Sequence, residues 1–445
     1  MARKLFGTDG VRGVAGEKLT AELALALGRS ACARSENDRP RVLVIRDTRE
    51  SGEMLESALA AGASESGAET LLAGVLPTPA APLLIARYGF DLAAVISASH
   101  NPYRDNGIKF FGADGYKLTD EQELEIERDL ESAAGADGGA HGAAVQPGRV
   151  RELHGAGEDY LRELHARFER LDLSGLDVVL DCANGATYRV APEIFRRLGA
   201  TVTVLADEPD GRNINDGCGS THIERLGATV AGGSHDLGFA FDGDGDRVLA
   251  VDREGVVVDG DELLALVALH LRAGGRLPGD GVAVTVMTNY GFHSAMAEAG
   301  IEVAVTAVGD RYVLEELRRR SWVLGGEQSG HIIESSFNST GDGIASALLT
   351  LEALGGRDLA ERDAMHKLPQ RLVNVPVRDR GALEGATQVN AGVELAAQEL
   401  AGRGRVLVRP SGTEPLVRVM VEAPTDEEAQ DVCGRLVELV QRELT

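Results

Sequence analysis

Residues 92–102 read Leu-Ala-Ala-Val-Ile-Ser-Ala-Ser-His-Asn-Pro, an apolar strand that runs directly into a short polar loop. The chain continues through Asp-Asn-Gly-Ile-Lys at residues 105–109. In α/β proteins, ligands bind at loops that follow the carboxyl ends of strands. Two serines, a histidine and a lysine close together supply a nucleophile, a proton carrier and a cation. We therefore expect a reactive centre at this strand end, with Ser99 as the nucleophile.

The composition is that of an ordinary globular protein, with 43% hydrophobic and 26% charged residues. The length of 445 residues suggests roughly three or four domains of ~100–150 residues each. The net charge of −25 argues against a nucleic-acid partner, because nucleic-acid phosphates require a basic surface. A phosphorylated substrate would be repelled overall, so its site must concentrate arginines locally. The remaining acidic excess indicates a solvated surface.

The four cysteines show no zinc-type spacing, which indicates reduced thiols in a cytosolic protein (Cys32, Cys182, Cys218 and Cys433). The first residues lack the apolar run of a signal peptide. No stretch approaches the ~20 apolar residues that a membrane span needs. We expect a cytoplasmic protein with no membrane partner, present as a monomer or a homodimer.

Short apolar strands alternate with amphipathic helices through three successive segments, which predicts βαβ units and a largely parallel sheet in each. The first helix is expected to begin at its N-cap, Thr20. The fold class is therefore α/β, with three similar mixed α/β domains and a smaller C-terminal α+β domain, over residues 1–148, 149–253, 254–367 and 368–445. The first boundary lies in the Ala/Gly-rich run 133–148. One unusual loop follows a late strand in each α/β segment, so the loops could face one central cleft.

The second segment carries Asp-Gly-Asp-Gly-Asp-Arg at residues 242–247. Three carboxylates (Asp242, Asp244 and Asp246) so close together repel one another unless a cation neutralises them. Oxygen ligands select Mg²⁺ or Ca²⁺. An EF-hand is excluded, because Arg247 and Arg253 occupy its glycine and glutamate positions. The alternative interpretation is an acidic turn that binds no metal. If the loop does bind a cation, Arg247 beside it would complement a phosphate shared with that cation.

The last segment carries Arg-Pro-Ser-Gly-Thr-Glu-Pro-Leu-Val-Arg at residues 409–418. Its two arginines, its hydroxyls and a glycine-freed backbone are the groups that bind a phosphate dianion. A polar hairpin is the alternative interpretation. In the third segment, Glu327 and Ser329 stand between glycines and suit hydrogen bonding to vicinal sugar hydroxyls. His331 follows them and is either a participant or a satisfied structural histidine.

Two basic residues remain open to two interpretations each. Arg12 lies in the glycine-rich run 6–13, whose backbone can approach a ligand closely or form a simple turn. Lys109 is either a cation of the site or a solvated lysine at a strand end. Taken together, a serine, a divalent cation, a phosphate clamp and a polyol loop indicate phosphoryl transfer on a sugar phosphate. There is no Walker A or kinase signature, so a nucleotide is not the evident donor.

The chain resembles the α-D-phosphohexomutases over essentially its full length, and within them it looks most like the bacterial phosphoglucosamine mutases. The resemblance rests on five motifs in the family's order, at residues 7–13, 97–102, 242–247, 326–331 and 409–415. The opening motif and Gln328 favour the phosphoglucosamine branch. The resemblance implies a heart-shaped enzyme of four domains, each of which contributes one loop to the cleft.

By motif match, Ser99 rather than Ser97 would be phosphorylated, and one Mg²⁺ would be held by Asp242, Asp244, Asp246 and an oxygen of that phosphate. The phosphoryl group would pass to O1 of glucosamine 6-phosphate. The resulting 1,6-bisphosphate would turn over and return its 6-phosphoryl group, releasing glucosamine 1-phosphate for UDP-N-acetylglucosamine and cell-wall synthesis. The bisphosphate is thus the intermediate and activator.

The resemblance also implies roles for the remaining residues. Lys109 would carry a proton, and Glu327 and Ser329 would grip the sugar. Further groups of the catalytic set are Arg12, His100, Arg247 and His331. The phosphate that is not reacting would be held by Arg409, Ser411, Gly412, Thr413 and Arg418, and a hinge at the last domain would let the intermediate turn.

Three rival functions stay open at this point. The first is a phosphomannomutase/phosphoglucomutase of the same family. The second is a Mg²⁺-dependent sugar phosphatase that uses Ser99 only transiently. The third, a non-catalytic sugar-phosphate sensor, is disfavoured because no motif of the set is missing.

Overall fold

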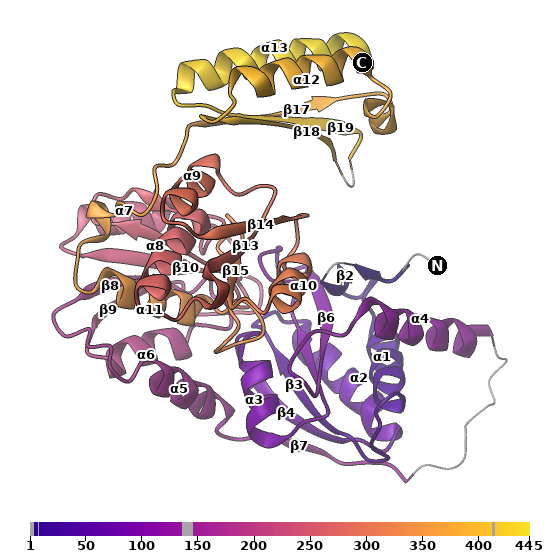
Figure 1. Ribbon diagram of the computed structural model, residues 1–445. Helices are drawn as coiled ribbons and strands as arrows, with labels where there is room; N and C mark the ends of the chain where they lie inside the picture. Colours follow the sequence, from indigo (N-terminus) through magenta and orange to yellow (C-terminus); the bar gives the residue numbers. More distant parts are fainter. Residues whose placement is uncertain (1–3, 8, 136–145, 412–413) are drawn as a thin grey trace. The chain divides into compact units, whose positions relative to one another are not determined.

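The computed structural model describes residues 4–7, 9–135, 146–411 and 414–445 (Figure 1). Residues 136–145 of the Ala/Gly-rich run, where we expected the first domain boundary, lie outside the described residues. The chain forms two compact units. The first unit comprises residues up to Val286 together with Ala304–Arg362, and the second comprises Met287–Val303 together with Asp363–Thr445.

The first sheet of the larger unit has the strand order β1-β2-β6-β5-β3-β4-β7. Its strands are β1 (Phe6–Gly7), β2 (Gly10–Val14), β3 (Arg41–Arg46), β4 (Glu69–Val75), β5 (Leu92–Ile96), β6 (Asp105–Gly112) and β7 (Val150–Glu152). The strands β3, β4, β5 and β7 are parallel, whereas β6 returns antiparallel beside β5 and β2 beside β6. The sheet is therefore mixed rather than largely parallel.

The helices of this part are α1 (Ala21–Ala33), α2 (Gly52–Glu65), α3 (Ala80–Tyr88) and α4 (Asp120–Gly135). The predicted N-cap of α1 is confirmed, since Thr20 Oγ1 accepts a hydrogen bond from Leu23 N at 3.2 Å. Apolar residues of α1, α2 and α4 pack in one core against the central strands β3 and β5. That packing fixes the carboxyl ends of β3 and β5 side by side.

The second sheet has the order β12-β11-β10-β8-β9 and the third has the order β14-β13-β15-β16. The second consists of β8 (Asp177–Asp181), β9 (Thr201–Leu205), β10 (Leu237–Phe241), β11 (Val248–Asp252) and β12 (Val257–Val258). The third consists of β13 (Gly281–Thr285), β14 (Glu302–Thr306), β15 (Leu324–Gly326) and β16 (Ile332–Glu334). Around them lie α5 (Ala156–Arg167), α6 (Val190–Arg197), α7 (Glu224–Gly232), α8 (Gly260–Ala273), α10 (Asp310–Arg320) and α11 (Gly343–Leu354), with short 3₁₀ turns η1 (Pro278–Asp280) and η2 (Leu359–Glu361).

Helices α8 and α11 lie between the second and third sheets, because each packs on β11 and also on a strand of the third sheet. This position explains the sequence of α11, Gly-Ile-Ala-Ser-Ala-Leu-Leu-Thr-Leu-Glu-Ala-Leu, in which nearly every residue is buried. A helix that is apolar on all sides has no solvent face. The two sheets therefore share one helical layer, which fixes the ends of their strands relative to each other.

The second unit contains a sheet of order β17-β19-β18, covered on one face by helices. Its elements are α9 (Tyr290–Glu298), β17 (Gln370–Pro376), η3 (Arg380–Leu383), α12 (Thr387–Glu399), β18 (Arg405–Pro410), β19 (Leu416–Glu422) and α13 (Asp426–Leu444). Adjacent strands are antiparallel. The predicted fold class, three mixed α/β domains followed by a smaller α+β domain, is confirmed.

All four cysteines are buried thiols that form no disulfide. Within the described ranges, no helix combines the length and the apolar character that a membrane crossing requires.

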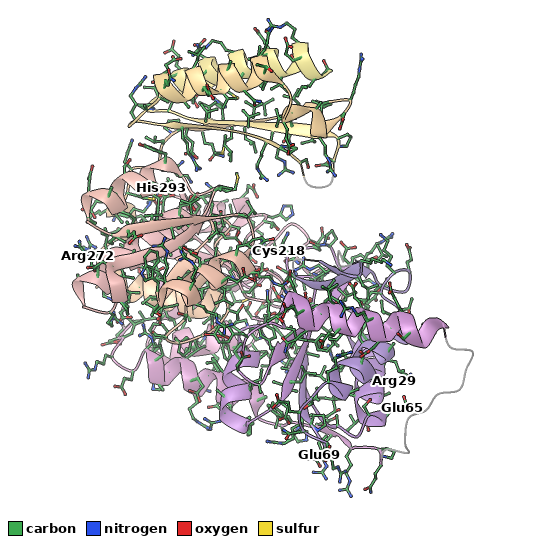
Figure 2. All side chains as sticks on the ribbon, turned by 45° about the vertical axis from the view of Figure 1, so that its right-hand side comes forward. Arg29, Glu65, Glu69, Cys218, Arg272 and His293 are labelled. Carbon is green, nitrogen blue, oxygen red and sulfur yellow. The ribbon has the colours of Figure 1, made fainter. Side chains whose placement is uncertain are left out.

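Helices α1 and α2 approach each other through glycines rather than through large side chains. A Cβ added to Gly28 would lie 2.2 Å from the carbonyl oxygen of Leu59, and one added to Gly62 would lie 1.9 Å from that of Leu25. Near the end of the same interface, Arg29 Nε donates to Glu65 Oε2 at 3.0 Å, and the two side chains lie close together in Figure 2. The absence of a Cβ therefore sets the distance between the two helices.

We predict that Gly62→Ala destabilises the protein by about 1–3 kcal/mol, because the clash with a backbone atom outweighs the gain in helix propensity. The measurement is the midpoint of urea unfolding, followed by circular dichroism. Gly232→Ala in α7 is the matched control, since nothing lies within 4 Å of its added Cβ. A Gly62→Ala midpoint equal to that of the control would contradict this account of the interface.

Candidate active site

Ser99 lies three residues beyond the end of β5 and is 1% exposed. Its φ of 52° is left-handed, a conformation that non-glycine residues adopt rarely. The Ser99 N–H donates to Ser97 Oγ at 2.9 Å, and Ser99 Oγ donates to Asp242 Oδ2 at 2.5 Å. His100 Nδ1 is 3.3 Å from the same hydroxyl. The strand end thus presents Ser99 directly to the acidic loop of the second sheet.

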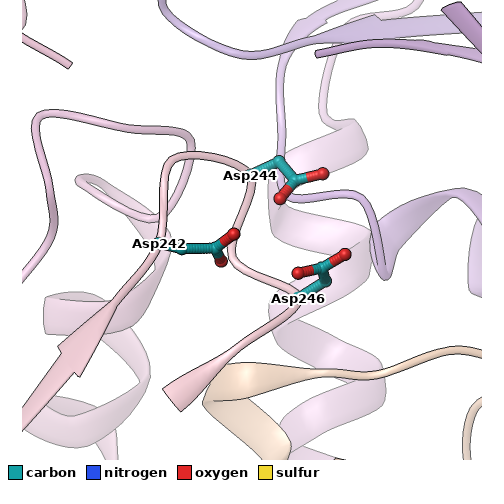
Figure 3. Close-up of side chains that lie close together, drawn as sticks. All are labelled: Asp242, Asp244 and Asp246. Atoms are coloured by element: carbon teal, nitrogen blue, oxygen red, sulfur yellow. The ribbon is translucent and has the colours of Figure 1, made fainter. Parts of the chain in front are cut away.

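The acidic loop connects β10 to β11, which pair antiparallel with Phe241 opposite Val248. Its aspartates are all buried, and their carboxylates turn toward a common point (Figure 3). One oxygen from each of Asp242, Asp244 and Asp246 lies within 4.8 Å of the others. The glycines between them are required by packing, because a Cβ on Gly243 would lie 2.6 Å from Ser99 O.

The three carboxylates could hold a metal ion, and two of their atoms fit that role. Asp244 Oδ1 and Asp246 Oδ1 are buried and accept no hydrogen bond from the described residues. Burial, followed by the charges of Asp246 and Asp244, raises the pKa of Asp242 well above its usual range. Because unsatisfied buried carboxylate oxygens are costly, a hard cation bound there would stabilise all three anions.

Lys109 lies within the buried strand β6, opposite Val95 of β5, and is 2% exposed. Its Nζ is 2.9 Å from Asp244 Oδ2, 3.2 Å from Asp9 Oδ2 and 3.8 Å from Asp246 Oδ2. Although burial disfavours the ammonium, these carboxylates raise the pKa of Lys109. The alternative of a solvated lysine at a strand end is therefore wrong, because β6 extends past it on both sides.

Lys109 is one member of a closed ring in which two lysines and a histidine alternate with three aspartates. Lys117 Nζ lies 2.5 Å from Asp9 Oδ1 and 2.5 Å from Asp310 Oδ2. The ring then passes through His331, whose Nε2 is 3.8 Å from Asp310 Oδ2 and whose Nδ1 is 3.7 Å from Asp246 Oδ2. Asp246 closes it at Lys109. Each of the two lysines has a carboxylate neighbour on either side, which compensates for its burial.

Two pKa values in this ring follow from these neighbours. Asp9 is buried, yet Lys109, Lys117 and Arg12 hold its pKa well below the usual range. Burial disfavours protonated His331, but Asp246 and Asp310 raise its pKa. Gly341 N donates to His331 Nε2 at 3.2 Å, which directs the Nδ1 proton toward Asp246. His331 is therefore both structurally satisfied and electrostatically engaged.

Arg12 and Arg247 bring two guanidinium groups to the same region. Arg12 pairs with Asp9, and Arg247 Nη1 is 3.1 Å from His100 Nδ1. Burial, together with Arg247 and Arg12, lowers the pKa of His100 to about 4, so this imidazole is neutral at pH 7. The Nε atoms of both arginines are buried and donate no hydrogen bond within the described part of the chain. These N–H groups are suited to an anionic group near Ser99.

The Glu327 loop joins β15 to β16 and rests on the start of β11. Gly330 has a φ of 88°, and a Cβ on it would lie 2.1 Å from Val248 O. Glu327 is half-buried, and its Oε1 accepts a hydrogen bond from Gly309 N at 3.1 Å, whereas Ser329 is exposed. Gln328 Nε2 donates to Asp259 Oδ2 at 3.2 Å. Glu327 and Ser329 therefore remain accessible beside Arg247, and Gln328 is tied to the N-cap of α8.

The phosphate-clamp loop predicted between β18 and β19 lies in the second unit. Arg409 and Arg418 are directly opposite each other across these strands. Like charges in such a pair repel, and burial together with Arg418 lowers the pKa of Arg409. Ser411 is buried at the end of β18, and Arg418 Nε is buried without a hydrogen-bond partner among the described residues. Gly412 and Thr413, also predicted for the clamp, lie outside the described residues.

Several residues at this site were not predicted from the sequence. Thr78 Oγ1 donates to Asp244 Oδ2 at 2.6 Å, which holds one triad carboxylate in place. Asp9 belongs to the opening motif, but its ion pairs give it a part in the charge ring. Lys117 and Asp310 had no signal in their local sequence, because they meet across 193 residues of chain.

Comparison with known proteins identifies the family to which the chain belongs. Models of the four phosphoglucomutase/phosphomannomutase domains match the chain, domain I at residues 3–136, domain II at 158–255, domain III at 259–372 and the C-terminal domain at 372–439. The phosphoglucosamine mutase of Moorella thermoacetica is 53% identical over 97% of this chain and 98% of its own. That of Bacillus subtilis is 48% identical over 99% of both chains.

Solved structures show the same fold at lower identity. A phosphoglucomutase/phosphomannomutase family protein from Burkholderia thailandensis has a TM-score of 0.83 at 24% identity, covering 99% of this chain and 97% of its own. The N-acetylphosphoglucosamine mutase of Aspergillus fumigatus, solved with GlcNAc-6P and magnesium, has a TM-score of 0.70 at 18% identity, covering 99% of this chain and 96% of its own. The chain therefore belongs to the phosphoglucomutase/phosphomannomutase family, and within that family its sequence groups with the bacterial phosphoglucosamine mutases.

Proposed function

We propose that this protein interconverts glucosamine 6-phosphate and glucosamine 1-phosphate through a phosphorylated Ser99. The observation that carries the proposal is the contact between Ser99 Oγ and Asp242 Oδ2 at 2.5 Å, at the edge of a buried carboxylate triad. A serine there can carry a phosphoryl group next to a metal ion. The relatives above, named phosphoglucosamine mutase, support the choice of the amino sugar.

The reaction is a transfer without net consumption of phosphate. The P–Oγ bond of phosphorylated Ser99 breaks as a P–O1 bond forms on glucosamine 6-phosphate, giving the 1,6-bisphosphate. The bound bisphosphate then presents its other end, and its P–O6 bond breaks as Ser99 is phosphorylated again. The product that leaves is glucosamine 1-phosphate, so the enzyme carries one phosphoryl group through each turnover.

Mg²⁺ would be held by Asp242, Asp244 and Asp246 together with an oxygen of the Ser99 phosphate. It would supply positive charge to the phosphoryl oxygens during transfer. Asp244 Oδ1 and Asp246 Oδ1, which accept no hydrogen bond from the described part of the chain, support this assignment. One such ion per chain accounts for the three buried anions.

The basic groups around the triad disperse the remaining charge of the transferred phosphoryl group. Arg12 and Arg247 each offer a buried Nε–H group that donates no hydrogen bond to any described residue. Lys109 is protonated beside its carboxylates. As the proton carrier it would give a proton to Ser99 Oγ when the phosphoryl group departs and take up the proton that the O1 hydroxyl of the sugar loses. Neutral His100 accepts from Arg247, and His331 steadies Asp246.

The sugar and its second phosphate would be held by two further loops. Glu327 and Ser329 would accept and donate hydrogen bonds to ring hydroxyls that both orientations of the bisphosphate share. The non-reacting phosphate would be bound by Arg409, Ser411, Gly412, Thr413 and Arg418. The like-charged pair Arg409 and Arg418 supports this, because an anion between them removes their repulsion.

We assign the four loops to four domains, over residues 1–148, 149–253, 254–367 and 368–445, as the sequence predicts. The free buried thiols support a reducing compartment, and we place the reaction in the cytoplasm.

The first prediction from the proposed function concerns Ser99 itself. Wild-type protein isomerises glucosamine 6-phosphate faster than glucose or mannose 6-phosphate, and intact-mass analysis with peptide mapping finds phosphate on Ser99. Ser99→Ala loses at least about 1,000-fold in turnover, because no other group can carry the phosphoryl group. Ser97→Ala, which removes the neighbouring hydroxyl, keeps the phosphate on residue 99 and so distinguishes the two serines as the phosphorylated residue.

The outcomes separate the rival functions. Preferred turnover of glucose or mannose 6-phosphate would favour the phosphoglucomutase/phosphomannomutase alternative. Net release of inorganic phosphate would indicate a phosphatase, and wild-type activity in Ser99→Ala would refute the phosphoserine route.

Metal binding gives a second prediction. Chelation of divalent cations abolishes isomerisation and added Mg²⁺ restores it, while calorimetry finds one ion per chain. Asp244→Asn weakens Mg²⁺ binding by at least about tenfold, because it removes an anionic ligand. Asp181→Asn is the control, since Asp181 is fully buried in the second sheet but lies outside the triad. Unchanged Mg²⁺ affinity in Asp244→Asn would rule out the triad as the site.

The clamp gives a third prediction. Arg418→Gln raises KM for the sugar phosphate by about tenfold or more, because it removes a charge-assisted hydrogen bond to the non-reacting phosphate. Arg371→Gln on β17 is the control, since Arg371 pairs with Asp426 at 2.5 Å and is exposed. Equal KM values for the two variants would count against the assignment of the clamp.

A further inference from the structure

The loop that carries Ser99 is adjacent to a second strand end that the mechanism has not used. Strand β3 pairs in parallel with β5, with Arg46 opposite Ile96. Residues that follow the two strands therefore emerge side by side at one sheet edge. Asp47 and Arg49 follow β3, and Ser97 and Ser99 follow β5.

Arg49 is completely buried and makes four hydrogen bonds. Its Nε donates to Asp47 Oδ2 at 2.8 Å, and the two side chains form an ion pair with 0% exposure of either. Its Nη2 donates to Ser99 O and to Asn101 O, both at 2.8 Å. Its Nη1 donates to Pro102 O at 2.5 Å. One guanidinium thus binds three carbonyls of the loop that carries Ser99.

Asp47 holds the backbone amide of Ser99, through the side chain of Ser97. Its Oδ2 accepts a hydrogen bond from Ser97 Oγ at 2.6 Å, and Ser97 Oγ in turn accepts from the Ser99 N–H at 2.9 Å. The ion pair therefore holds both backbone polar groups of Ser99, the carbonyl directly and the amide through Ser97. These hydrogen bonds therefore hold Ser99 in its left-handed conformation, with a φ of 52°.

A residue from the domain of the second sheet binds the same loop carbonyls as Arg49. Asn215 Nδ2 donates to Ser99 O at 2.9 Å and to Asn101 O at 3.1 Å, the same two carbonyls that Arg49 Nη2 binds. Asn215 comes from the loop between β9 and α7. The conformation of the Ser99 loop is therefore over-determined by residues from two sheets, which is the condition under which a strained backbone persists.

We propose that Asp47 and Arg49 are positioning residues that hold Ser99 Oγ against the carboxylate triad during phosphoryl transfer, an inference that rests on the proposed function. Their hydrogen bonds fix the left-handed backbone from which Ser99 reaches Asp242. An arginine is required, since its planar fork bonds several carbonyls at once, whereas a lysine ammonium is a point charge. Small displacements of a reacting atom reduce the rate without weakening substrate binding.

The test compares Arg49→Lys and Arg49→Met with Arg41→Met. Arg41 is the matched control, because it also donates to backbone carbonyls, those of Tyr88 and Gly89, but at the opposite end of β3. We expect kcat per mole of folded protein to fall about 100-fold in both Arg49 variants, with KM within about threefold of wild type. The ³¹P resonance of phosphorylated Ser99 should shift or broaden in them and stay unchanged in Arg41→Met.

A second variant keeps the test decisive if Arg49→Met does not fold. Asn215→Ser removes the outer hydrogen bonds to the same carbonyls, and it should lower kcat rather than raise KM. Folded Arg49→Lys and Asn215→Ser proteins that turn over at the wild-type rate would overturn the inference, leaving a merely structural role. If the wild-type protein itself does not isomerise the substrate, the proposed function fails first, which is a different result.

Discussion

The concentration of buried negative charge at Asp242, Asp244 and Asp246 is the constraint on which the rest of the site depends. Three anions within 4.8 Å cannot remain buried unless positive charge surrounds them. The chain supplies part of this positive charge itself. Lys109 pairs directly with Asp244. Lys117 is linked to the triad more remotely, because it pairs with Asp310, and His331 lies between Asp310 and Asp246. Among the described residues, two of the carboxylate oxygens accept no hydrogen bond, and we propose that a divalent cation binds them. The positive groups that neutralise the buried carboxylates are therefore also the groups that would face a phosphoryl group on Ser99.

The positions of the loops that form the site are determined by the ends of the strands and by glycines that let the loops touch. Ser99 emerges from β5 and the triad from β10, and the two loops touch because Gly243 has no side chain to separate them. The Glu327 loop seats on β11 in the same way, through Gly330. The parallel pairing of β3 with β5 then places Arg49 under the Ser99 loop. The Ser99 loop, the aspartate loop and the Glu327 loop are thus placed by backbone contacts that a side chain on Gly243 or Gly330 would prevent.

Much of this could be predicted from the sequence, because the signals are local. The N-cap Thr20, the apolar strand before Ser99 and the aspartate triplet each lie within a few residues of what they determine. Features that depend on long-range pairing could not be predicted. Lys109 is buried only because β6 returns antiparallel beside β5, and Lys117 meets Asp310 across 193 residues of chain. Arg49 is an ordinary strand-end arginine in the sequence, and only the fold reveals the carbonyls that it binds.

The most direct test of the central claim follows the phosphoryl group itself. Protein labelled with ³²P on Ser99 is mixed with a small excess of unlabelled glucosamine 6-phosphate and quenched at successive times. If phosphorylated Ser99 is the donor, the label leaves the protein within one turnover, passes through the sugar 1,6-bisphosphate and ends in glucosamine 1-phosphate. Label that stays on the protein while isomerisation proceeds, or that appears as inorganic phosphate, would contradict the phosphoserine route.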